Sequence, residues 1–115
     1  MSQNLVVDIA SQTDVHDLKS RLEWGQPGFT ILDVRDRHSY NHGHIMGAIP
    51  IALDDLASGA KSSLHPDRHI YVYGENDEQA ANAAQALREA GFNHVSELIG
   101  GLLAWKTAGG ATEGY

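Results

Sequence analysis

The first third of the chain shows two different spacings of apolar residues. Three of these residues, spaced three and four positions apart, are Val15, Leu18 and Leu22. This spacing predicts a helix with one apolar face, capped by Thr13 or Asp14. Residues 29–34 (Phe-Thr-Ile-Leu-Asp-Val) are almost continuously apolar, which is typical of a central strand in a parallel sheet.

Strand-like and helix-like segments continue to alternate up to residue 108. Residues 69–73 predict a strand by their β-branched and aromatic content, and the alanine-rich segment 77–90 predicts a helix that ends at Gly91. Shorter patterns predict strands at 5–9, 48–53 and 95–98, and helices or helical turns at 36–43, 54–60 and 101–108. This alternation is typical of an α/β fold with a parallel sheet covered by helices on both faces.

The composition fits one globular domain and excludes several kinds of chemistry. The chain has 115 residues, of which 42% are hydrophobic, enough for one ordinary core. We expect a domain over residues 1–108 and a short, loosely ordered C-terminal tail over 109–115. Because the chain contains no cysteine, it has no disulfide, thiolate metal site, CxxC redox pair or cysteine nucleophile.

The charge and the length of the apolar runs restrict the partners. Eight basic residues against 15 acidic ones give a formal charge of −7, which disfavours binding to nucleic acid or to an anionic membrane surface. No apolar run approaches the roughly 20 residues of a membrane span, and the N-terminal residues lack the basic region of a signal peptide. We therefore expect a cytoplasmic protein with no nucleic-acid or membrane partner.

The turn after the strand at 69–73 is the sharpest candidate for a binding site. It follows a parallel strand and opens a helix, where backbone N–H groups and the helix dipole favour anions. Three carboxylates, those of Glu75, Asp77 and Glu78, lie in this turn and oppose anion binding. The simplest interpretation is an acidic helix start capped by Asp77 or Asn76. The alternative is a loop that holds a cation or a basic group of a partner.

Three blocks of sequence, in this order, resemble the signatures of rhodanese-like domains. The first block is Asp33-Val34-Arg35, Tyr40 and Gly43-His44-Ile45-Met46-Gly47-Ala48; the second is Tyr73, Ala80-Ala81, Ala83-Ala84, Leu87 and Gly91-Phe92; the third is Val95, Leu98, Gly100-Gly101 and Ala104-Trp105. The resemblance implies a sulfurtransferase-type fold with a five-stranded parallel sheet flanked by helices. In active members a cysteine opens the loop after the fourth strand and carries sulfur as a persulfide.

This chain departs from the family pattern at the positions that carry out the reaction in active members. The nucleophile position falls on Gly74, the position of a frequent loop arginine falls on Gln79, and a frequent acidic residue is replaced by Ser39. We therefore expect no catalytic residue and a catalytically inactive binding or regulatory module, which takes up no small anion strongly. The alternative is a rhodanese-type sulfur-transfer role with a cysteine supplied by a protein partner.

The candidate site residues follow from the same resemblance. The binding-loop candidates are Gly74, Glu75, Asn76, Asp77, Glu78, Gln79 and Ala80, and the candidates that support the pocket are Asp33, Arg35 and His44. We expect Asp33 to contact nearby backbone or to pair with Arg35 or Arg37.

Other residues of interest have simpler interpretations. His38, His42 and His44 are close in sequence, but Gly43 disfavours a regular helix across the three, so we expect neither a metal site nor a cofactor. A cation sensor built from the loop carboxylates and nearby histidines stays as a third interpretation. Asp54 and Asp55 are interpreted as a helix cap, and Trp24 and Trp105 as core residues.

Overall fold

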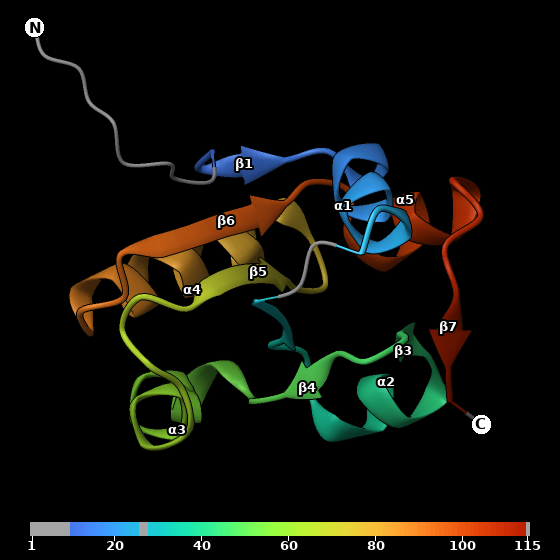
Figure 1. The fold of residues 1–115 in the computed structure, drawn as a ribbon. Helices are drawn as coiled ribbons and strands as arrows, with labels where there is room; N and C mark the ends of the chain where they lie inside the picture. Colours follow the sequence, from blue (N-terminus) through green and yellow to red (C-terminus); the bar gives the residue numbers. More distant parts are fainter. Residues whose placement is uncertain (1–9, 26–27, 115) are drawn as a thin grey trace, which may run out of the picture.

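Five parallel strands form the central sheet, in the order β1-β6-β5-β2-β4 (Figure 1). The computed structural model describes residues 10–25 and 28–114. The strands are β1 (Gln12–Thr13), β2 (Phe29–Asp33), β4 (Ile49–Pro50), β5 (His69–Tyr73) and β6 (His94–Leu98). The predicted strand at 5–9 lies outside the described residues. The sheet itself confirms the α/β class and the five parallel strands.

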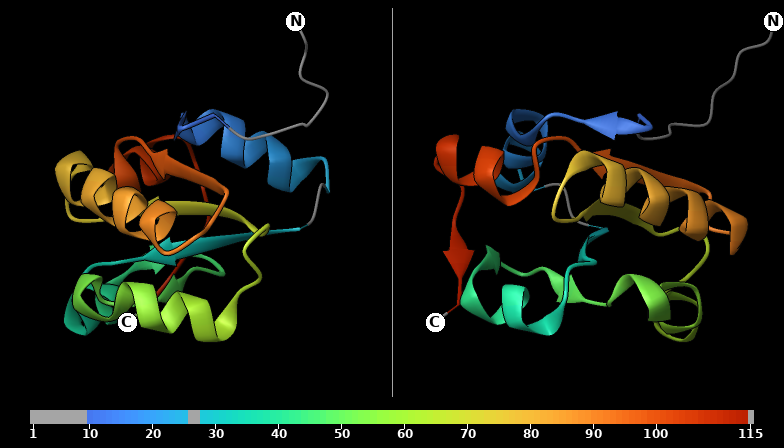
Figure 2. Two further views of the ribbon diagram at one scale, coloured as in Figure 1. Left: turned by 90° about the vertical axis from the view of Figure 1, so that its left-hand side faces the viewer. Right: turned by 180° about the vertical axis from the view of Figure 1, so that it is seen from behind.

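Helices cover both faces of this sheet, as the side view and the rear view show (Figure 2). Helices α1 (Val15–Glu23) and α5 (Gly101–Thr107) pack on one face, and α3 (Leu56–Ser63) and α4 (Asp77–Glu89) pack on the other. The connection from β2 to α3 contains α2 (Arg37–His42), β4 and the 3-10 helix η1 (Leu53–Asp55).

The strands supply both faces of the sheet with apolar side chains. Along β5, Ile70 and Val72 belong to the cluster under α3 and α4, whereas Tyr71 and Tyr73 belong to the cluster under α1 and α5. Successive side chains of a strand point to opposite faces, so a continuously apolar strand fills two cores. This arrangement holds the carboxyl ends of β2 and β5 side by side, in register from Phe29↔His69 to Asp33↔Tyr73.

The element boundaries differ from the predicted ones where the pattern is short. Thr13 lies in β1, so the cap of α1 is Asp14, whose side chain accepts a hydrogen bond from the His16 N–H. Asp55 occupies the N-cap position of α3 but makes no side-chain capping bond. The strand predicted at 48–53 contains only the two residues of β4, because η1 begins at Leu53.

Residues 111–113 of the predicted C-terminal tail contact the rest of the domain. Strand β7 (Thr112–Glu113) pairs antiparallel with β3 (His44–Ile45). Just before β7, the Ala111 carbonyl accepts hydrogen bonds from the indole Nε1–H of Trp105 at 2.8 Å and from the Met46 N–H at 3.0 Å. These contacts fasten the tail to the segment that follows α2.

The two tryptophans occupy opposite environments. Trp105 is 2% exposed in the core, as predicted, whereas Trp24 at the end of α1 is 80% exposed, so its assignment to the core is wrong.

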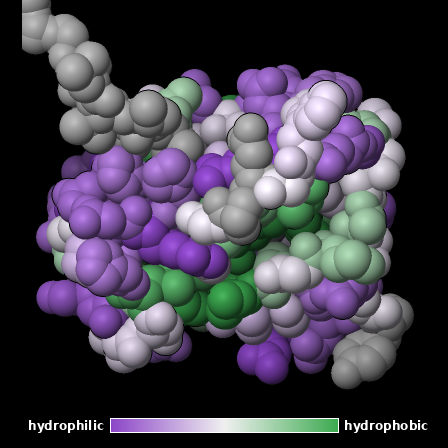
Figure 3. All heavy atoms as spheres, in the orientation of Figure 1, coloured by the Kyte–Doolittle hydropathy of each residue, from purple (hydrophilic) through white to green (hydrophobic). Residues whose placement is uncertain are grey.

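Hydrophobic surface forms a band between hydrophilic regions on the face shown in Figure 3. In the part of the chain that the structure describes, no helix is both long and apolar enough to cross a membrane.

Candidate functional site

The loop between β5 and α4 brings most of the binding-loop candidates to one end of the sheet. Gly74 continues from buried Tyr73, and the chain turns into α4 within three residues. The turn is fixed by Asn76, whose side-chain oxygen accepts the Gln79 N–H at 2.8 Å. Asn76 is therefore the helix cap, one of the two residues predicted for that role. An N-cap amide of this kind satisfies a backbone donor that the helix leaves unpaired.

The side chain of Gln79 folds back over the start of the loop. Its Oε1 accepts a hydrogen bond from the Glu75 backbone N–H at 2.7 Å. A Cβ atom placed on Gly74 would lie 2.5 Å from this oxygen and 3.0 Å from the Cβ and Cγ atoms of Gln79. Gln79 therefore fills the space that a side chain at position 74 would enter. It also accepts the hydrogen bond of the Glu75 N–H, which is then not available to a ligand.

The acidic side chains of the loop connect it to its neighbours. Glu75 accepts a hydrogen bond from the Ser39 hydroxyl of α2 at 3.1 Å, and Asp77 accepts the Gly100 N–H at 2.9 Å. Glu75, Asp77 and Glu78 are all exposed. The three charges face solvent at the loop, where they repel an approaching anion. The hydrogen bonds of Glu75 and Asp77 hold the loop against α2 and the start of α5.

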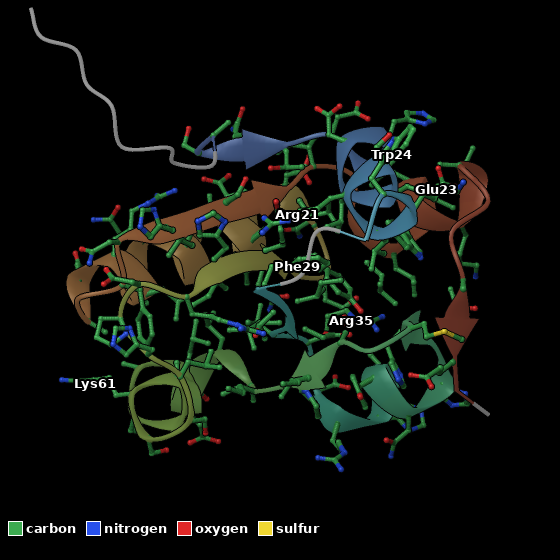
Figure 4. All side chains as sticks on the ribbon, viewed as in Figure 1. Arg21, Glu23, Trp24, Phe29, Arg35 and Lys61 are labelled. Carbon is green, nitrogen blue, oxygen red and sulfur yellow. The ribbon has the colours of Figure 1, made fainter. Side chains whose placement is uncertain are left out.

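Beneath the loop, Asp33 and Arg35 form a buried ion pair. Arg35 Nη2 lies 2.7 Å from Asp33 Oδ2 and donates a further hydrogen bond to the Gly43 carbonyl at 2.6 Å. The Tyr73 hydroxyl donates to the same Asp33 oxygen at 2.7 Å and accepts the Ile45 N–H at 3.1 Å. The predicted pairing of Asp33 with Arg35 is thus confirmed. Figure 4 shows Arg35 between the end of β2 and the α2–β3 segment.

This environment shifts the pKa values of the buried groups. Burial raises the pKa of the Tyr73 hydroxyl, and the adjacent Asp33 charge and hydrogen bond raise it further, so Tyr73 stays neutral. Burial by itself lowers the pKa of Arg35, but the hydrogen bonds and charge of Asp33 outweigh it, so the net shift is upward. Arg35 is therefore a protonated cation whose Nε and Nη2 groups bond Asp33 and the Gly43 carbonyl.

His44 supports the scaffold from the other side of α2. Its ring stacks on Tyr40 with centroids 3.6 Å apart, and its Nδ1 lies 2.7 Å from the Tyr40 carbonyl oxygen. Nε2 lies 3.4 Å from the Glu113 carboxylate of β7. His44 is buried, so it organises the β3–β7 connection and lines none of the loop surface.

A cavity of about 290 Å³ opens beside the loop. It is lined by Arg35, Gly74, Glu75, Asn76, Asp77, Gly100, Gly101, Leu102 and Leu103. Gln79 is not among these residues. Thus Gly74 to Asp77 and Arg35 come together here. The candidates that do not line the cavity are Asp33, His44, Glu78, Gln79 and Ala80. Ala80 is buried in the first turn of α4.

The wall of the cavity formed by Gly100 to Leu103 was not predicted from the sequence. The signal that could have found it is the pair Gly100 and Gly101. Both residues have positive φ angles, 83° and 55°, at the turn from β6 into α5. A pair of glycines directly after a parallel strand indicates a tight turn at the carboxyl edge of the sheet, next to the loop after β5.

Within residues 10–25 and 28–114, no group of three or more histidine, aspartate or glutamate side chains is arranged to hold a metal ion.

The fold and the loop define the class of protein. A five-stranded parallel sheet with helices on both faces, and a loop that opens α4 at its carboxyl edge, is the arrangement expected from the resemblance. Residues 14–108 match the family described as "Rhodanese-like domain". The chain belongs to this family, and it lacks the active-site cysteine because it has no cysteine at all.

Its relatives include sulfurtransferases. The chain is 40% identical over 78 residues to the thiosulfate sulfurtransferase GlpE of Shewanella oneidensis, which covers 68% of this chain and 76% of that protein. It is 35% identical over 75 residues to the uncharacterized protein YqhL of Bacillus subtilis, covering 65% of this chain and 59% of YqhL. The chain thus spans about three fifths of the length of YqhL.

A solved structure confirms the fold. The rhodanese-like domain of the Alr3790 protein from Anabaena sp., determined by solution NMR, is 62% identical and superposes with a TM-score of 0.90. The superposition covers 93% of this chain and 81% of that one. The chain is therefore a sulfurtransferase homologue with a rhodanese-like fold.

Proposed function

We propose that this rhodanese-like domain has no sulfurtransferase activity of its own and acts as a binding or regulatory module through the loop that follows Tyr73. The observation that carries the proposal is the contact between positions 74 and 79. Gly74 has no side chain to carry sulfur, and Gln79 Oε1 already accepts the Glu75 N–H. A persulfide needs a thiolate, and an anionic donor needs free N–H groups.

The charge of the loop supports a protein contact over a small anionic ligand. Glu75, Asp77 and Glu78 expose three carboxylates, and the nearest buried cation, Arg35, is neutralised by Asp33. Thiosulfate would meet repulsion here and find no free positive charge. Calorimetry with thiosulfate is therefore expected to give no binding heat.

The loop is suited to contact a partner because its shape is set in advance. Hydrogen bonds tie it to α2 through Ser39 and to the start of α5 through Gly100. A preorganised surface loses little conformational entropy on binding. A cytoplasmic location is part of this proposal, and fractionation of the source cells tests it.

Turnover of thiosulfate with cyanide as acceptor tests the lack of activity. The unmodified chain should show no rate above background, and Gly74→Cys should recover little. In this variant the Gln79 side chain competes for the space, and the three carboxylates raise the pKa of the new thiol. A catalytic relative such as GlpE serves as positive control. Strong recovery from Gly74→Cys alone would falsify the proposal of a loop reorganised away from catalysis.

Site-specific photo-crosslinking tests the role of the loop. A photoreactive residue at Glu78 is compared with one at Ser62, an exposed position in α3. We expect a discrete crosslinked protein from position 78 that is absent from position 62. The additional change Glu75→Lys should weaken this product. Identical crosslinking from both positions would contradict a role for the loop.

A second candidate function, sulfur transfer with a cysteine supplied by a partner, is favoured by the cavity beside Gly74. This space of about 290 Å³ is lined by Gly74 and not by Gln79, so a side chain from another protein could enter it beside Gly74. The protein crosslinked at position 78 would then carry a cysteine whose thiolate takes the outer sulfur of thiosulfate as a persulfide when the complex forms, with the S–S bond of thiosulfate broken and sulfite released. A crosslinked partner without a reactive cysteine excludes this function.

A further inference from the structure

Two exposed histidines of α2, His38 and His42, point their ring nitrogens at each other. They lie four positions apart in one helix, so their side chains share a face. The two Nε2 atoms are 3.1 Å apart, and the rings meet edge to face with centroids 4.4 Å apart. Both side chains are exposed. A hydrogen bond between two neutral imidazoles accounts for this distance, with one ring donating Nε2–H to the other.

The same separation fits a metal ion held between the rings. Late transition metals bind histidine nitrogen at about 2.0–2.1 Å. With Nε2 atoms 3.1 Å apart, an ion at this distance from both would subtend an N–metal–N angle of about 98°. This angle lies between that of square-planar or octahedral coordination and that of tetrahedral coordination. The helix therefore presents two ligands at the required spacing without any change of backbone.

We infer that His38 and His42 bind one divalent late transition-metal ion through their Nε2 atoms, and that water fills the remaining positions. The ring that donates Nε2–H in the metal-free protein shifts this proton to Nδ1, so each ring stays neutral and presents one lone pair. Imidazole ligands and the general order of affinity favour copper(II), with nickel(II) and zinc(II) weaker.

Their place in a helix sets the pair apart from His44, which is close in sequence, and from His65 and His69, which have the same spacing. His44, the third histidine of the segment, is buried and stacked on Tyr40, because Gly43 ends α2 before it. His65 is four positions from His69, but it lies in a loop outside β5 and its Nδ1 accepts the Asp67 N–H. The histidine spacing in the sequence therefore does not distinguish these pairs, whereas the helix does.

Charges of both signs lie near the pair. The Asp36 carboxylate is the N-cap of α2, and the Arg37 guanidinium of the same helix lies over the Tyr40 ring. The formal charge of the whole chain is −7. Attraction of a divalent cation to the negatively charged chain as a whole therefore adds to the two nitrogen ligands.

Calorimetric titration of the full chain with copper(II) and with zinc(II), each as the metal alone, tests the site. His38→Gln and His42→Gln should each weaken binding by about tenfold or more, because one ligand holds a metal far less well than two. His16→Gln, which removes a lone exposed histidine from α1, is the matched control and should leave the affinity unchanged. Equal affinity in all four proteins would overturn the inference.

Two further measurements separate ligand loss from damage to the helix. His42→Glu restores a metal-binding side chain, so it should bind zinc(II) more tightly than His42→Gln. In histidine-detected NMR of the unmodified chain, zinc(II) should shift the Nε2 resonances of His38 and His42 and leave that of His16 in place. A zinc-dependent shift confined to other histidines would place the metal elsewhere and overturn the assignment.

Discussion

At the scale of single residues, the loop brings together Gly74 and Gln79, the two positions at which the family resemblance implies a cysteine and a frequent arginine. A glycine at 74 leaves room for the Gln79 side chain, and Gln79 in turn satisfies the Glu75 N–H. The two residues therefore form one structural unit. Changing one of them alone creates a clash or leaves the N–H group without its partner.

This coupling predicts a non-additive effect on stability. Gly74→Ala should lower the free energy of unfolding by about 1–3 kcal/mol, because the new Cβ displaces Gln79 and breaks its hydrogen bond. In a Gln79→Ala background the same change should cost less, because the Oε1 and Cγ atoms are gone and only the Cβ of residue 79, at 3.0 Å, remains close. Urea unfolding of the four proteins of this double-mutant cycle measures the difference. Equal costs in both backgrounds would show that the two positions are independent.

The second residue-scale prediction concerns Tyr73, whose pKa is raised by burial and by Asp33. Tyr73→Phe should lower the free energy of unfolding by about 1–3 kcal/mol at neutral pH, since two buried hydrogen bonds are lost. A raised pKa means that above the reference value of about 10 the unfolded chain loses its proton while the folded chain keeps it. Stability from this group is therefore complete below about pH 10 and declines above it.

Comparison of the two proteins across pH isolates this contribution. Other groups titrate in both proteins, so the difference in unfolding free energy between the unmodified chain and Tyr73→Phe reports Tyr73. We expect the difference to be constant from neutral pH to about pH 9 and to shrink as pH rises further. A difference that stays constant up to the highest pH at which the protein folds would contradict the raised pKa.

At the scale of elements, a helix or strand could be predicted from the sequence where its pattern of apolar and polar residues was long enough to show a period. β5 and α4 were predicted within one residue, because each has enough residues to show its own periodicity. The two-residue strands β1, β3 and β7 were not predicted. Their identity comes from hydrogen bonds to distant segments, such as the pairing of His44 with Glu113, and two residues carry no period.

The same distinction applies to the candidate site. The loop and its acidic character follow from neighbouring residues in the sequence, and so does the Asn76 cap. The wall formed by Gly100 to Leu103 comes from a separate strand–helix unit, so its approach to the loop depends on the sheet order. The Gln79–Glu75 contact depends on a side-chain rotamer, which no sequence pattern specifies.

The element-scale prediction concerns the C-terminal segment. Deletion of residues 111–115 removes the Ala111 carbonyl that Trp105 and Met46 share and the pairing of β7 with β3. We expect the melting temperature to fall by about 4–8 °C, the shift that corresponds to about 1 kcal/mol in a domain near this size. A Trp24→Phe background leaves Trp105 as the fluorophore, and its emission should shift to longer wavelength. An unchanged melting temperature and emission would show that the segment is dispensable.

At the scale of the whole molecule, one sheet separates two apolar clusters, one under α3 and α4 and the other under α1 and α5. Leu87 of α4 is fully buried in one cluster, and Trp105 of α5 is buried in the other. The strands between them contribute side chains alternately to both clusters, so loss of one cluster removes support from the shared strands. This arrangement favours a single cooperative unfolding transition, as is usual for a domain of this size.

Leu87→Ala tests this cooperativity in the Trp24→Phe background. The cavity should lower the free energy of unfolding by about 2–5 kcal/mol. If the sheet couples the two faces, urea unfolding followed by Trp105 fluorescence and by far-UV circular dichroism should show the same reduced midpoint, although Trp105 does not belong to the cluster that contains Leu87. A circular dichroism midpoint that falls while the Trp105 midpoint stays in place would mean that the two faces unfold separately. Coincident midpoints in the parent protein are the control, because the comparison depends on them.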